Sequence, residues 1–85
     1  MTKNKTVLFD ELRQILKSLG YREKRTENAI VFDRDQVRLL LFRLYGDNEP
    51  VDARDIASTR RFLDAWGLLD AVDFDVRLQS ATSPA

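Results

Sequence analysis

The chain has 85 residues, of which 44% are hydrophobic and 33% charged, and its 14 basic and 14 acidic side chains cancel to zero net charge. This length fits one domain around a single small core; we place it at residues 6–78, with frayed ends at 1–5 and 79–85. The chain contains neither cysteine nor histidine, which excludes disulfide frameworks, thiolate zinc sites and histidine-based catalytic triads.

The first expected element is a helix over residues 7–19. Apolar side chains recur there at the spacing of one helical face, at Leu8, Leu12, Ile15, Leu16 and Leu19. Thr6 suits the N-cap position. Gly20 follows the last apolar position, where a left-handed C-terminal cap favours a residue without a Cβ.

Three strands are predicted next, at residues 21–25, 29–32 and 37–44. The first is polar, whereas the second is rich in β-branched and aromatic residues. Turn-forming residues at 26–28 and 33–36 separate the three segments. A three-stranded antiparallel meander is therefore the simplest arrangement.

Two further helices follow a polar loop at 46–50. Asp52 suits the N-cap of a helix that runs to Trp66. The inner face of this helix is predicted to carry Ile56, Thr59, Phe62, Leu63 and Trp66. A short last helix carries Phe74 and Leu78. The whole order indicates a two-layer α+β domain, α-β-β-β-α with a short extra C-terminal helix.

This order is shared by the double-stranded-RNA-binding domain and by the HicA family of bacterial toxins. The segment from Leu12 to Tyr21 resembles the first helix of a HicA-like chain, with its glycine and following aromatic residue. Arg25 and the segment Ala29–Phe32 resemble the family's second-strand region. HicA toxins are ribonucleases with a catalytic histidine at the start of that strand, where this chain has Ala29. The resemblance therefore implies a non-catalytic relative with a small protein partner over its sheet, as antitoxins cover HicA-like toxins.

Other enzyme signatures are missing from the sequence. It has no glycine-rich phosphate loop and no nucleophile elbow. Asp33 and Asp35 offer two carboxylates to Mg²⁺, but turn chemistry explains both residues. The longest apolar run, Leu39–Phe42, is far too short for a membrane span. We expect a cytoplasmic protein that is not an enzyme and has no cofactor, metal or small-molecule substrate.

The third predicted strand is apolar on both faces. A sheet with helices on one face should alternate apolar with polar residues, yet leucines occupy both odd and even positions between 39 and 44. Either the last helix covers the surplus side chains or another molecule does. We predict a protein-binding surface, for a second copy or a small protein partner, formed by Arg38, Leu40, Phe42 and Leu44.

Charge is distributed unevenly along the chain. Residues 1–45 sum to +4 and residues 46–85 sum to −4. The alternative function is weak binding of structured RNA, with phosphate contacts from the basic side chains Lys17, Arg22, Lys24 and Arg25. The acidic start of the second long helix opposes this alternative, because its carboxylates repel phosphates.

Overall fold

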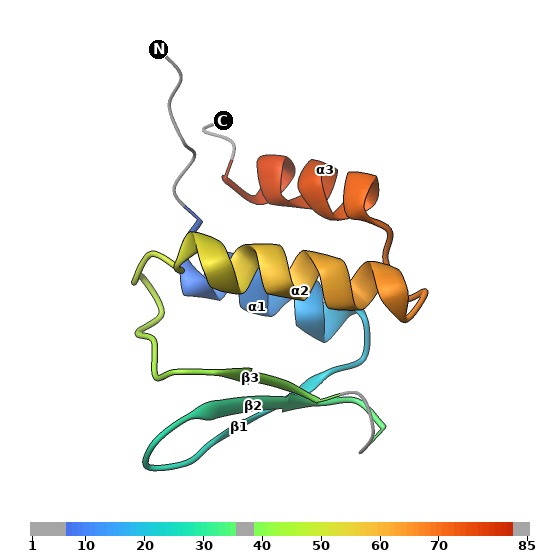
Figure 1. The fold of residues 1–85 in the computed structure, drawn as a ribbon. Helices are drawn as coiled ribbons and strands as arrows, with labels where there is room; N and C mark the ends of the chain where they lie inside the picture. The colour runs from blue at the N-terminus through green and yellow to red at the C-terminus, as the bar shows by residue number, and fades with distance from the viewer. Residues whose placement is uncertain (1–6, 36–38, 83–85) are drawn as a thin grey trace.

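The computed structural model describes residues 7–35 and 39–82, with side chains up to residue 78. Its elements are, in order, α1 (Phe9–Ser18), β1 (Arg22–Arg25), β2 (Ile30–Asp33), β3 (Leu40–Phe42), α2 (Ala53–Ala65) and α3 (Ala71–Thr82). The predicted α+β class and element order are confirmed. In Figure 1, α1 and α2 lie over one face of the sheet, and α3 lies across these helices, away from the sheet. With 12 residues, α3 is longer than the short helix expected.

The sheet is an antiparallel meander in the order β1-β2-β3. Phe32 on β2 pairs with Leu40 on β3. Val31 on β2 pairs with Leu41 on β3 and, on its other side, with Lys24 on β1. Since alternate residues point to opposite faces, Phe32 and Leu40 face the helices, and Val31 and Leu41 face away. The prediction for the third strand was too long, because β3 has only three residues. Residues 37 and 38 of that prediction lie outside the described residues.

The first helix begins at Phe9, two residues later than predicted. Its N-cap is Leu8, whose N–H donates to the Glu11 carboxylate at 2.8 Å; the predicted cap, Thr6, lies outside the described residues. The loop before α2 holds this end, since the Phe9 N–H donates to the Glu49 carbonyl at 2.9 Å. The predicted end is confirmed: Gly20 adopts a left-handed φ of 96°.

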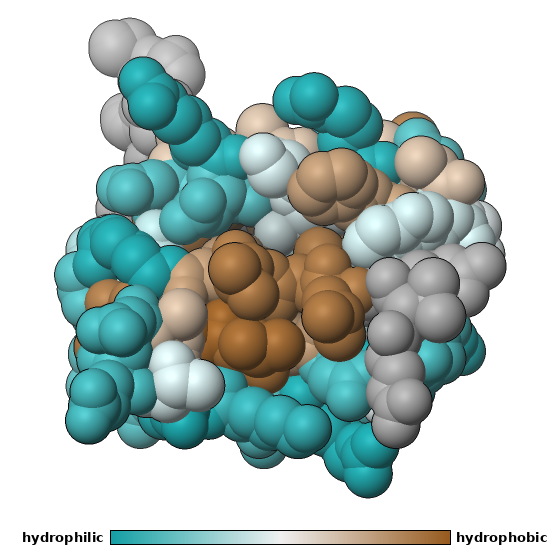
Figure 2. Space-filling model, turned by 60° about the horizontal axis from the view of Figure 1, so that its bottom comes forward, coloured by the Kyte–Doolittle hydropathy of each residue, from teal (hydrophilic) through white to brown (hydrophobic). Residues whose placement is uncertain are grey.

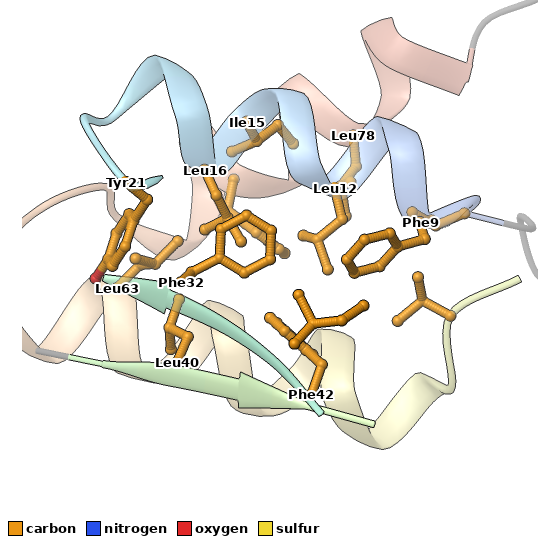
Figure 3. Packing of buried hydrophobic residues seen from close by; sticks show 14 of the residues in the cluster. Phe9, Leu12, Ile15, Leu16, Tyr21, Phe32, Leu40, Phe42, Leu63 and Leu78 are labelled. Atoms are coloured by element: carbon orange, nitrogen blue, oxygen red, sulfur yellow. The ribbon is translucent and has the colours of Figure 1, made fainter. Parts of the chain in front are cut away.

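The core is centred on the fully buried ring of Phe9. Its ring stacks on Tyr45 with centroids 5.3 Å apart and meets Phe32 and Phe42 at 6.1 and 6.0 Å. Leucines and isoleucines of α1 and the sheet pack around these rings, as Figure 3 shows. Phe74 on α3 is also fully buried, so the last helix closes the core over α1 and α2. It leaves the outer face of the sheet uncovered.

Tyr45 organises the start of α2. Its hydroxyl accepts a hydrogen bond from the Asp52 N–H at 3.0 Å and donates one to the Asp55 carboxylate at 2.6 Å. Asp52 is the N-cap as predicted, but its own side chain makes no capping hydrogen bond. The Tyr45 hydroxyl instead links the N–H of this N-cap residue to the side chain of Asp55, the third residue of α2. Burial, together with the bond to Asp55, raises the pKa of Tyr45 above its ordinary value.

Arg13 joins three parts of the chain electrostatically. Its guanidinium lies 2.7 Å from Asp10 on α1, 2.9 Å from Glu23 on β1 and 2.7 Å from Asp47 in the 46–50 loop. It also lies 5.2 Å from the centroid of the Phe9 ring. The side chains of Arg13 and Glu23 are both only 14% exposed, so this pair is shielded from solvent better than an ordinary surface pair. The cluster ties the loop before α2 to the first helix and strand.

Two accessible carboxylates make the fold sensitive to acid. The hydrogen bond from Arg13 lowers the pKa of Asp47, and bonds from the Gly46 N–H and from Arg43 lower the pKa of Glu49. A lowered folded-state pKa means that the unfolded chain takes up protons first as the pH falls. The contribution of these two carboxylates to the free energy of unfolding is therefore fully present above their ordinary pKa, near 4. It is lost as the pH falls through their lower pKa values in the folded chain.

We accordingly expect the free energy of unfolding to decrease between about pH 5 and about pH 3. Urea denaturation at several pH values measures it. The double variant Asp47→Asn with Glu49→Gln should show a flatter pH dependence, and added salt should flatten that of the unmodified chain. A double variant with the original pH dependence would contradict this assignment.

Candidate protein-binding surface

The free edge of the sheet is the first component of the site. In the described residues, β3 pairs with β2 alone and has no strand on its other side. An edge strand presents unpaired backbone N–H and C=O groups, which can accept another extended chain. Natural edges are commonly protected by charged side chains. The three residues of β3, Leu40–Phe42, are all apolar.

Exposed apolar side chains adjoin this edge. Leu41 is 67% exposed, Leu39 is 47% exposed, and Phe62 on α2 is 46% exposed. We call these three residues the β3 patch. Figure 2 shows a hydrophobic surface in the middle of this side of the molecule, with hydrophilic residues below it and to its left. A continuous apolar surface with a polar rim is typical of a protein-binding site.

A shallow pocket connects the patch to α2. It is lined by Leu39, Leu40, Leu41, Phe42, Asp55, Ser58, Thr59 and Phe62. Asp55 is the one ionisable residue of this lining, and its carboxylate accepts the hydrogen bond from Tyr45. The Thr59 hydroxyl donates to the Asp55 carbonyl at 2.8 Å. The pocket therefore has an apolar side, formed by β3 and Phe62, and a polar side, formed by Asp55, Ser58 and Thr59.

The sequence prediction assigned the surface to the wrong face of β3. Leu40 and Phe42 are only 3% and 5% exposed, because their pairing with Phe32 and Ile30 turns them toward the core. Of the predicted set, Leu44 is exposed (42%) just beyond the strand. Arg38 lies outside the described residues.

Phe62 was expected on the inner face of α2 and is instead 46% exposed. The buried residues of this helix are Thr59 and Leu63. The Phe62 ring stacks on Trp66, with centroids 5.4 Å apart and planes 13° from parallel. Trp66 is half-buried against the core, so it supports the Phe62 ring from one side and leaves the other side free for a partner.

The four candidate RNA-binding residues do not form one surface. Arg22 and Lys24 are exposed on the outer face of the sheet, because they alternate with Glu23, which contacts Arg13 on α1. Lys17 belongs to α1, which covers the opposite face. Arg25 donates to the Tyr45 carbonyl and to the Glu23 carboxylate. Only two of the four cations therefore share a face.

The carboxylate pair considered for Mg²⁺, Asp33 and Asp35, gains no third ligand from the described residues. Asp33 was predicted in a turn but is the last residue of β2 and is 5% exposed. Asp35 lies two residues later, 3.8 Å from the Arg34 guanidinium. Among the described residues, no group of three metal-ligating side chains comes together.

Comparisons with family models, with curated proteins and with solved structures find no match to this chain. The feature it shares with HicA-like and double-stranded-RNA-binding chains is the α-β-β-β-α topology with a three-stranded antiparallel sheet. Within the described residues, none of the helices has the length and hydropathy needed to span a membrane.

Proposed function

We propose that this chain is a small non-enzymatic binding module that associates with another polypeptide through the β3 patch and the adjoining strand edge. The observation that carries the proposal is the exposure of Leu41, 67%, on an edge strand. Burying such a side chain in an interface removes apolar surface from water, and pairing the edge satisfies backbone groups at the same time. Both gains come from the same contact.

The pocket beside the edge supports this mode of binding. An extended segment added to β3 points alternate side chains to the two faces of the sheet. One set would lie beside Leu41 on the outer face, and the other would enter the pocket near Phe62. The resemblance to HicA-like chains adds support for a protein partner, and Ala29 in place of the histidine supports a non-enzymatic role.

We do not extend the proposal to RNA. The affinity of such complexes depends on several phosphate contacts from one surface, whereas of the four candidate cations only Arg22 and Lys24 share a face. The row of the sheet that contains Lys24 continues with Val31 and Leu41. Apolar side chains at these positions offer nothing to a phosphate backbone.

Affinity capture with matched variants tests the proposed function. The tagged chain, Leu41→Glu and Val72→Glu are each incubated with a lysate of the cells in which the chain occurs. Val72 lies on α3 and is 69% exposed, close to the 67% of Leu41, so its variant introduces the same charge at an equally exposed apolar site. We expect a protein retained by the unmodified chain and by Val72→Glu but lost from Leu41→Glu. Identical recovery with all three baits would overturn the proposal.

A further inference from the structure

We infer that the partner of the β3 patch is a second copy of this chain, joined edge to edge so that two three-stranded sheets form one six-stranded sheet. This inference rests on the proposed function and names the partner for it. The side chains of the β3 patch, Leu39, Leu41 and Phe62, are all apolar, so the surface that covers them must itself be largely apolar. The β3 patch has that chemistry.

The backbone of β3 is complementary to a copy of itself. Two identical edge strands related by a two-fold axis pair in antiparallel fashion and exchange equivalent N–H···O=C bonds. The strand β3 has only three residues, Leu40–Phe42. If all three pair with the second copy, the two-fold axis must pass beside the middle residue, Leu41. Leu41 then meets its own copy on the outer face, and Leu40 lies opposite Phe42 of the second copy.

The rows of the combined sheet fit this arrangement. Lys24, Val31 and Leu41 form one row across the three strands. Joining two such rows at Leu41 gives an apolar centre of two leucines and two valines, with one lysine at each end. The lysines remain in solvent, and no like charges are brought together. The zero net charge of the chain also means that two copies have no overall repulsion.

The dimer should be weak. A typical stable interface buries about 800 Å² on each partner, more than three partly exposed side chains and a three-residue edge supply. We therefore expect a dissociation constant on the order of 10 µM. Light scattering on solutions from about 1 to about 500 µM should show the average mass rise from 9.9 kDa toward twice that value.

Variants identify the interface. Leu41→Glu should raise the dissociation constant at least about tenfold, and Val72→Glu should leave it unchanged. Because the chain has no cysteine, Leu41→Cys introduces a single thiol at the proposed axis. Residues directly opposite in an antiparallel pair have Cα atoms about 4.5–5.5 Å apart, within disulfide range. Oxidation should therefore give a covalent dimer with Leu41→Cys and not with Val72→Cys.

The outcomes distinguish the self-association inferred here from the broader proposal that the β3 patch binds another polypeptide. A chain that stays at 9.9 kDa at the highest concentration is not its own partner. If Leu41→Glu nevertheless loses a captured protein that Val72→Glu retains, the binding function stands with a different polypeptide as partner. A dimer that persists in Leu41→Glu, or that crosslinks equally in Leu41→Cys and Val72→Cys, would overturn the edge-to-edge arrangement.

Discussion

Replacing Phe9 with alanine should remove most of the stability of this domain. The fully buried ring contacts three other aromatic rings, those of Phe32, Phe42 and Tyr45. Truncation of a buried phenylalanine costs about 3–5 kcal/mol, because the surroundings fill the cavity only in part. A domain of this size has roughly 4–13 kcal/mol in total. Urea denaturation followed by circular dichroism should show Phe9→Ala unfolded or close to its midpoint without denaturant.

Phe62→Ala is the matched control for this prediction. It removes the same number of atoms from a residue that is 46% exposed and that stacks, among the described residues, on Trp66 alone. We expect a loss below about 1 kcal/mol, mainly the stacking contact. Similar losses in both variants would mean that Phe9 is not at the centre of the core.

Local sequence signals predicted where the helices and strands lie better than they predicted the contacts between them. The end of α1 followed from Gly20, because a positive φ there favours a residue without a side chain. Its start could not be predicted in this way. Phe9 begins the helix because its N–H bonds to Glu49, forty residues away in sequence. Periodicity therefore assigned Leu8 to the buried face, and the structure buries Phe9.

The candidate site depended on information that the sequence pattern does not contain. Since β3 is apolar at every position, alternation gave no indication of which residues face the core. Pairing with Phe32 on β2 decides it, by turning Leu40 inward and Leu41 outward. Phe62 and Leu63 are neighbours on α2, about 100° apart around the helix, and packing alone determines which of them is buried. The surplus of apolar residues was visible in the sequence, but their direction was not.

Adjacent substitutions on β3 should therefore have opposite outcomes, and this is the most direct test of the register. Leu40→Glu places a carboxylate in the core beside Phe32, at a position 3% exposed. An unpaired buried charge of this kind costs several kcal/mol, enough to unfold a domain of this size. Leu41→Glu places the same carboxylate in solvent, where surface substitutions change stability by about 0.5 kcal/mol or less.

Thermal denaturation and one-dimensional proton NMR distinguish the two variants at low protein concentration, where any self-association is absent. The expected result is a folded spectrum for Leu41→Glu and an unfolded one for Leu40→Glu. A reversal would mean that β3 pairs with β2 one residue out of the observed register, since a one-residue shift exchanges the two faces of a strand. That shift would bury Leu41 and remove the β3 patch. The fold of β3 and the binding surface proposed on it therefore depend on the same pairing of Leu41 with Val31.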